Sequence, residues 1–83
     1  MEYAAIDFET AYWGPGSACS LGISVSNGNE ITDEWYRLIK PYRMNFDSVC
    51  VQVNGIYPDD VENEPAFPAF WQEVAQRLEG SIV

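Results

Sequence analysis

The order of apolar and polar residues predicts a strand followed by a hairpin in the first half of the chain. Residues 3–8 are mostly apolar and are followed by a loop rich in glycine and proline, which is typical of a strand end. Residues 18–26 alternate small polar with apolar side chains, and residues 30–39 are again rich in apolar ones. The Asn-Gly-Asn sequence at 27–29 suits a tight reversal between them. The pattern predicts that these last two segments pair as antiparallel strands.

The second half contains an irregular connector and one clear helical pattern. Over residues 41–65 we expect a helical turn at 48–53 and loop at 58–60, where the sequence reads Pro-Asp-Asp. A helix is predicted from near Pro68 to Gly80, because apolar residues recur there at steps of three and four. The residues of this stripe are Phe67, Phe70, Trp71, Val74, Ala75 and Leu78.

Residues 81–83 (Ser-Ile-Val) resemble the start of a further strand. A strand that follows a helical crossover is expected to lie parallel to the first strand and beside it. The predicted fold class is therefore α/β with a mixed sheet that is truncated. It has three N-terminal strands, a connector with short helical turns, one crossover helix and the start of a fourth strand.

The charge balance is strongly acidic and narrows the modes of binding. The 83 residues contain 4 Lys and Arg against 13 Asp and Glu, which gives a net charge of −9. So few basic residues cannot form the basic stripe of a protein that binds nucleic acid through phosphates alone. The two cysteines are far apart and there is no histidine, so the usual zinc pattern is missing. Without a signal-like N-terminus or a long apolar run, a reduced, cytoplasmic protein with no membrane partner is expected.

Two acidic residues in the first strand are the candidates for chemistry. Side chains alternate along a strand, so Asp7 and Glu9 are expected on the same face, with Cα atoms about 6.5 to 7 Å apart. Two carboxylates at that spacing can share Mg²⁺ or Mn²⁺, which favour oxygen ligands and activate water for phosphodiester hydrolysis. An Asp-x-Glu sequence is also common by chance in an acidic chain, where it is merely solvated charge. The apolar strand before the pair and the small residues after it favour the metal site.

Several short segments, in order, carry a resemblance to a known family. The sequence Ala-Ile-Asp-Phe-Glu-Thr at 5–10 resembles the first motif of the DEDD exonuclease superfamily, which includes the epsilon subunit of DNA polymerase III and ribonuclease T. The similarity continues through residues 17–22, 33–41 and 53–58 and covers nearly the whole chain. It identifies residues 1–83 as the N-terminal portion of a single exonuclease domain with an RNase H-like fold.

The resemblance implies a metal-dependent 3′-to-5′ exonuclease that hydrolyses phosphodiester bonds at the 3′ end of single-stranded DNA or RNA. It implies that Asp7 and Glu9 are catalytic residues and ligands of two Mg²⁺ or Mn²⁺ ions, and that a DNA polymerase is a candidate partner. Its remaining ligands come from motifs that lie beyond residue 83, so the chain alone is expected to be inactive. The residues implied to lie against the 3′-terminal nucleotide are Phe8, Thr10, Val53, Asn54 and Ile56.

Two details of the sequence bear on nucleotide contact. Asn54 stands where family members commonly have histidine, which weakens the expectation of a direct base or sugar contact there. Tyr12 and Trp13 are candidates for base stacking, although packing or simple exposure is the favoured interpretation for both.

Two other readings remain open at this point. The chain could be a non-catalytic acidic α/β interaction module that binds a protein through the helix at 67–78, although such a stripe more often covers a sheet. It could also be a truncated relative with a structural role that self-associates through an open sheet edge.

Overall fold

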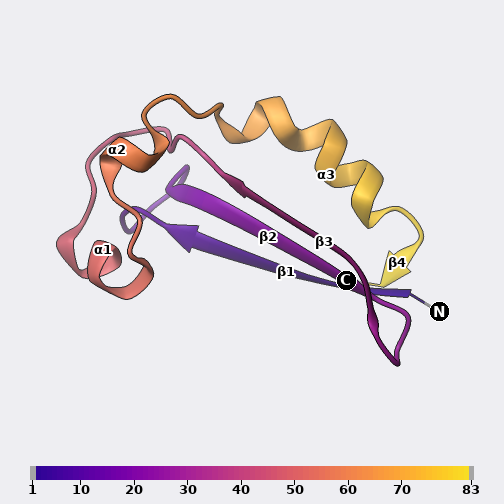
Figure 1. Cartoon of the computed structure of the whole chain (residues 1–83). Helices are drawn as coiled ribbons and strands as arrows, with labels where there is room; N and C mark the ends of the chain where they lie inside the picture. Colours follow the sequence, from indigo (N-terminus) through magenta and orange to yellow (C-terminus); the bar gives the residue numbers. More distant parts are fainter. Residues whose placement is uncertain (1, 83) are drawn as a thin grey trace.

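A computed structural model describes residues 2–82 of the chain, which form one four-stranded sheet with helices along one face and at one end (Figure 1). The strands are β1 (Glu2–Thr10), β2 (Ala18–Ser26), β3 (Ile31–Leu38) and β4 (Ser81–Ile82). Their order in the sheet is β3-β2-β1-β4. β1 pairs antiparallel with β2 and parallel with β4, and β2 pairs antiparallel with β3, so the predicted mixed sheet is confirmed.

The helical elements all lie between β3 and β4 in the sequence. They are α1 (Ser48–Asn54), α2 (Pro58–Val61), a 3₁₀ turn η1 (Phe67–Phe70) and α3 (Trp71–Leu78). Figure 1 shows α3 running along one face of the sheet, whereas α1 and α2 gather at the end where β1 finishes. No described helix has the length and apolar character that crossing a membrane requires.

The helix α3 is held to the sheet by an apolar cluster and by one polar cluster. Phe70 and Val74 are buried against β2 and β3 residues, and the Phe70 ring meets the Trp35 ring edge-on at 6.2 Å. The Trp35 indole N–H donates to the Glu73 carboxylate at 2.9 Å, and Arg77 pairs with Asp33 at 2.8 Å. This packing covers one face of the sheet, so the opposite face of β1, β2 and β3 stays open.

A second, smaller core joins the end of β1 to the connector. Its buried members are Ala11, Cys19, Ile56 and Val61. Asp47 begins α1 by accepting hydrogen bonds from the main-chain N–H groups of Val49 and Cys50, at 2.8 and 3.4 Å. Gly55 ends α1 with a φ of 71°, a conformation that glycine adopts without steric cost.

Three sequence-based expectations about this half need correction. The Pro-Asp-Asp segment is the start of the helix α2 and not loop, because proline suits the first helical position and the Asp60 side chain accepts the Tyr57 N–H at 2.9 Å. The predicted helix starts as a 3₁₀ turn before α3. In the expected apolar stripe, Trp71 and Ala75 are exposed, since they lie at its margin while Phe70 and Val74 face the sheet.

Candidate active site

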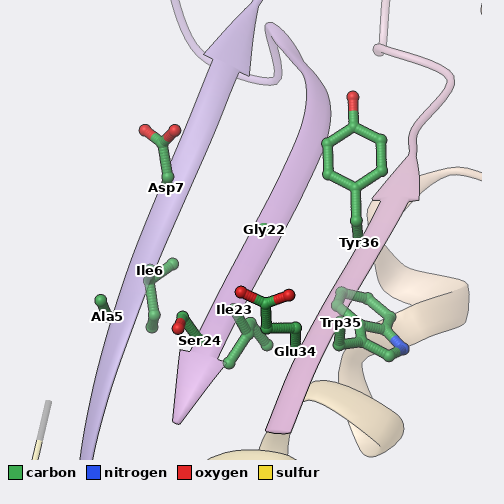
Figure 2. A pocket seen from close by; sticks show the side chains of 9 residues that line it. All are labelled: Ala5, Ile6, Asp7, Gly22, Ile23, Ser24, Glu34, Trp35 and Tyr36. Carbon is green, nitrogen blue, oxygen red and sulfur yellow. The ribbon is translucent and has the colours of Figure 1, made fainter. Parts of the chain in front are cut away.

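Asp7 lies on the open face of the sheet, in the central strand β1. It pairs with Gly22 of β2, which has no side chain to fill the space beside it. A shallow groove of about 390 Å³ results across the three strands, and Figure 2 shows the Asp7 carboxylate standing clear of β1 at one side of this groove, with Tyr36 at the other. The residues that line the groove are Ala5, Ile6, Asp7, Gly22, Ile23, Ser24, Glu34, Trp35 and Tyr36.

Glu9 follows two positions later on β1 and is half-buried. The pairing of β1 with β2 is regular from Tyr3 to Glu9, so strand alternation puts Asp7 and Glu9 on one side of the sheet. Glu9 borders a smaller hollow of about 90 Å³, between the end of β1 and α1, which we call the Glu9 hollow. Thus each carboxylate borders its own hollow. The second hollow is lined by Glu9, Thr10, Trp13, Val49, Cys50, Val53 and Asn54.

A β-bulge comes directly after Glu9. Glu9 pairs with Ser20 but Thr10 pairs with Ala18, so Cys19 is the extra residue on β2. The Cys19 thiol lies 3.5 Å from the Glu9 carbonyl oxygen, to which it donates. Burial, and secondarily the Glu9 charge, raises the pKa of Cys19 to about 11. Without a bound metal ion, the thiol therefore stays neutral near pH 7.

Asn54 connects α1 to the end of β1. Its side-chain amide donates to the Thr10 carbonyl oxygen at 2.9 Å, and its side-chain oxygen accepts the Ile56 N–H at 2.8 Å. These bonds use one of the two amide hydrogens and the carbonyl oxygen of the side chain. Asn54 thus positions the wall of the Glu9 hollow, which is a structural task that the resemblance did not imply.

The residues predicted to lie against a nucleotide differ in what they expose. Val53 is 78% exposed and lines the Glu9 hollow. The Ile56 side chain is buried in the smaller core, and the Phe8 ring packs edge-on against Phe67 at 6.0 Å on the α3 side of the sheet. Ile56 could consequently meet nucleic acid only through main-chain atoms. The Phe8 ring is 46% exposed but lies on the face of the sheet opposite Asp7 and Glu9.

Sequence reasoning did not single out Val49 and Tyr36, which line the two hollows, and it ranked Trp13 as packed or simply exposed. Trp13 is 79% exposed and also borders the Glu9 hollow. Strand alternation could have placed Tyr36 on the open face. Nothing local in the sequence indicates Val49, because its approach to β1 depends on the packing of the connector.

Asp7 and Glu9 offer the type of ligand atom that a hard divalent cation prefers, although two side chains are few for a metal site. Both acids offer carboxylate oxygens, and the sequence contains no histidine that could compete with them. Across residues 2–82, no group of three or more Asp, Glu, His or Cys side chains is arranged so that it could hold a metal ion. Asp7 and Glu9 are therefore a partial ligand set.

Comparison with solved structures supports the fold. The similar chains include a full-length 3′-exonuclease, the 3′-exonuclease of a study of 3′-end specific recognition of a histone mRNA stem-loop, and cell-death related nuclease 4. The first two are 23% identical to this chain over 94% of its length and the third is 17% identical over 93%, all with a TM-score of 0.75. Exonuclease X, in complex with 5′ overhanging duplex DNA, is 19% identical over 95%, with a TM-score of 0.73.

The chain spans 39% of the length of each of the first two, 29% of cell-death related nuclease 4 and 44% of exonuclease X. It is thus less than half as long as these solved proteins. The likeness shows that the sheet and α3 have the RNase H-like arrangement of an exonuclease over this part.

Sequence comparison gives two results. A search of curated protein sequences finds no significant match. The family model of the RNase T exonucleases matches residues 4–83, which is nearly the whole chain. With its RNase H-like fold and this match, the chain belongs to the RNase T family of exonucleases.

Proposed function

We propose that the chain carries the first part of a metal-dependent 3′-to-5′ exonuclease site, which acts on the 3′ end of single-stranded DNA or RNA. One observation carries the proposal. Asp7 and Glu9 lie two positions apart on the regular part of the central strand, and each borders a surface hollow at the side of the sheet that α3 leaves open. Because the chain belongs to an exonuclease family, we take these two carboxylates to serve phosphodiester hydrolysis.

Asp7 and Glu9 would hold Mg²⁺ or Mn²⁺ through carboxylate oxygens. Such ions, when bound, lower the pKa of a coordinated water and offset the charge that develops on the leaving oxygen. Glu9 has the more enclosed position, which reduces competition from bulk water for its carboxylate. Asp7 stays exposed, so it can reach a ligand that approaches across the open groove.

The Glu9 hollow is proposed to receive the 3′-terminal nucleotide. Its walls combine the main chain at Thr10 with the exposed Val53 side chain, and Asn54 fixes the two walls relative to each other. Two of the similar structures concern nucleic acid, one a histone mRNA stem-loop and the other a duplex DNA with a 5′ overhang. They support a nucleic-acid substrate without deciding between RNA and DNA.

We infer that residues 1–83 form the N-terminal portion of a single exonuclease domain and that this chain alone is inactive. Mg²⁺ keeps most of its waters and gains little from two carboxylates, and the described residues offer no third ligand nearby. The solved chains of similar fold are more than twice as long. Incubation of the purified chain with a 5′-labelled single strand and Mn²⁺ should leave the strand intact. Steady shortening from the 3′ end would contradict this.

The metal site is tested by titrating the chain with Mn²⁺ and following the paramagnetic signal of free ion. Weak binding is expected, and Asp7→Ala and Glu9→Ala should each abolish it. Glu30→Gln is the matched control, because Glu30 is an exposed acid outside both hollows. If Mn²⁺ binds equally well to all four proteins, the carboxylate pair is not a metal site.

Preference for a strand end is tested by comparing a linear single strand with a circular one of the same length. The linear strand should bind more tightly in Mn²⁺, and the preference should vanish in Asp7→Ala. Equal affinity for the circle would contradict action at an end.

We do not favour the alternative in which the chain is a module that binds a protein partner through α3. The side chains that such a partner would need, Phe70 and Val74, are already buried against the sheet.

A further inference from the structure

A third hollow lies between the loop after β1 and the loop after β3, at the end of the sheet where the Glu9 hollow is found. Its volume is about 520 Å³ and it is lined by Tyr12, Trp13, Gly14, Pro15, Tyr42, Arg43 and Asn45. We call this third hollow the loop groove. Trp13 borders both the loop groove and the Glu9 hollow. The exposed Trp13 is thus a residue that the two hollows share.

The walls of the loop groove are tied together by hydrogen bonds. The Tyr42 N–H donates to the Gly16 carbonyl oxygen at 2.9 Å, and the Tyr12 hydroxyl donates to the Pro15 carbonyl oxygen at 3.2 Å. Gly16 has a φ of 72°, and a methyl group there would come within 2.8 Å of the Tyr42 Cβ. Only glycine therefore allows the two loops to approach so closely.

Exposed aromatic rings dominate the loop groove. Tyr42 is 80% exposed and Trp13 is 79% exposed. Large rings that are this accessible cost free energy in water and offer flat apolar surfaces on which bases can stack. The Arg43 guanidinium lies 5.9 Å from the centre of the Tyr42 ring, so a cation accompanies the aromatic surface.

The charge of the loop groove is opposite to that of the chain as a whole. The chain has a net charge of −9, yet the loop groove is lined by one arginine and no acid. The hollows around Asp7 and Glu9 contain carboxylates, whereas this one contains none. Arg37 and Arg77 are paired with acids near α3, but Arg43 makes no ion pair within residues 2–82. Arg43 is consequently free to meet an anion.

We propose that the loop groove binds the nucleotides on the 5′ side of the terminal one in a single-stranded nucleic acid. A base stacks on the Tyr42 ring, Arg43 contacts a phosphate, and Trp13 is shared with the Glu9 hollow. The inference rests on the proposed function, because it takes the terminal nucleotide to lie beside Glu9. It also explains how so acidic a chain holds a polyanion, with stacking and one unpaired arginine in place of a basic stripe.

The test compares a 5′-labelled oligothymidylate with thymidine 5′-monophosphate as ligands of the whole chain in Mn²⁺, by fluorescence anisotropy and by competition. The oligomer should bind more tightly than the monophosphate. Tyr42→Ala and Arg43→Ala should each weaken oligomer binding about fivefold to tenfold and leave the monophosphate unaffected. Tyr42→Phe should bind like the unaltered chain, because it keeps the stacking surface.

Two matched controls lie outside the loop groove. Tyr3→Ala removes an exposed tyrosine from β1, and Lys40→Ala removes the other cation without an ion pair among the described residues. Both should change oligomer affinity less than twofold. Arg43→Ala should also lower the dependence of oligomer affinity on salt by about one counterion, whereas Tyr42→Ala should not.

The outcomes separate this inference from the proposed function. If Tyr42→Ala and Arg43→Ala leave oligomer affinity unchanged, the loop groove is not a nucleotide-binding site, even if Asp7→Ala still abolishes Mn²⁺ binding. If Asp7→Ala and Glu9→Ala both still bind Mn²⁺ as well as the unaltered chain does, the proposed metal site is overturned instead. A groove that captures a proline-rich peptide but shows no preference for the oligomer over the monophosphate would also overturn the assignment to nucleic acid.

Discussion

The Asn54 side-chain amide donates a hydrogen bond of 2.9 Å to the Thr10 carbonyl oxygen, across 44 positions of the sequence. Thr10 follows Glu9 directly, at the bulge where the ladder with β2 changes register. The bond therefore holds the end of α1 against the part of β1 that carries the candidate metal ligand. Among the side-chain hydrogen bonds of residues 2–82, it is the one that joins the connector to a strand. It therefore makes the shape of the Glu9 hollow sensitive to a residue on α1.

Asn54→Ala is expected to loosen this junction. The substitution removes the donor to Thr10 and the acceptor for the Ile56 N–H, so a loss of about 1–3 kcal/mol in the free energy of unfolding is expected. Urea denaturation measures it, and Mn²⁺ affinity should fall as well. Asn63→Ala, an exposed position with no side-chain hydrogen bond among the described residues, is the control. Equal stability of the two variants would contradict the role given to Asn54.

Glu73 is expected to stabilise the contact between α3 and β3. Its carboxylate accepts the Trp35 indole N–H at 2.9 Å, while Arg37 and Arg77 lie 3.9 and 3.7 Å from the same oxygen. Glu73→Ala should cost about 1–3 kcal/mol of unfolding free energy, because it leaves a partly buried donor unpaired. Glu73→Gln keeps an acceptor and should lose less. Urea unfolding followed by tryptophan emission compares them, and a larger loss in Glu73→Gln would refute the hydrogen bond as the cause.

Cys19 makes stability depend on pH in the alkaline range. Its pKa is raised from 9.0 to about 11 in the folded chain, chiefly by burial. The folded state keeps the thiol proton that the unfolded state releases above pH 9, so the stabilising contribution is complete below pH 9 and is lost as the pH rises to about 11. Its size is on the order of 2 kcal/mol. Unfolding of the chain and of Cys19→Ala at pH 8, 9, 10 and 11 should show a steeper decline in the unaltered chain; parallel curves would exclude this cause.

Gly16 and Gly55 provide a matched pair of left-handed glycines. Both have a φ near 71°, but a methyl group at Gly16 would meet the Tyr42 Cβ at 2.8 Å, whereas one at Gly55 would meet nothing within 4 Å. Gly55→Ala should therefore cost only the backbone strain of about 1 kcal/mol, and Gly16→Ala should cost clearly more. Thermal unfolding measures both. Equal melting temperatures would mean that the loops around Tyr42 separate easily.

The chain is expected to be a monomer in solution, against the reading in which its open sheet self-associates. The edge strand β3 carries Asp33, Glu34 and Arg37, and charged side chains on an edge oppose pairing with a second copy. The net charge of −9 adds repulsion between copies. Light scattering across a range of concentrations tests this, and a concentration-dependent rise in mass would restore the self-association reading.

The sequence by itself determined the elements whose pattern is local. The alternation at 18–26, the Asn-Gly-Asn turn and the apolar steps around Phe70 and Val74 predicted the hairpin and the crossover helix, because strand and helix periodicities are properties of neighbouring residues. The spacing of Asp7 and Glu9 likewise put them on one face of a strand. The Pro-Asp-Asp helix was missed because its stability comes from burying Val61 in a core that includes Ala11 and Cys19.

Only the tertiary structure decided what surrounds the two acids. The approach of α1 to β1 creates the Glu9 hollow, and the absence of a side chain at Gly22 opens the groove beside Asp7. The contact of two distant loops brings Trp13, Tyr42 and Arg43 together in the loop groove. These features depend on residues separated by 15 to 44 positions in the sequence. Periodicity carries no information about such pairs, because the distance between them is set by how the sheet and the connector pack.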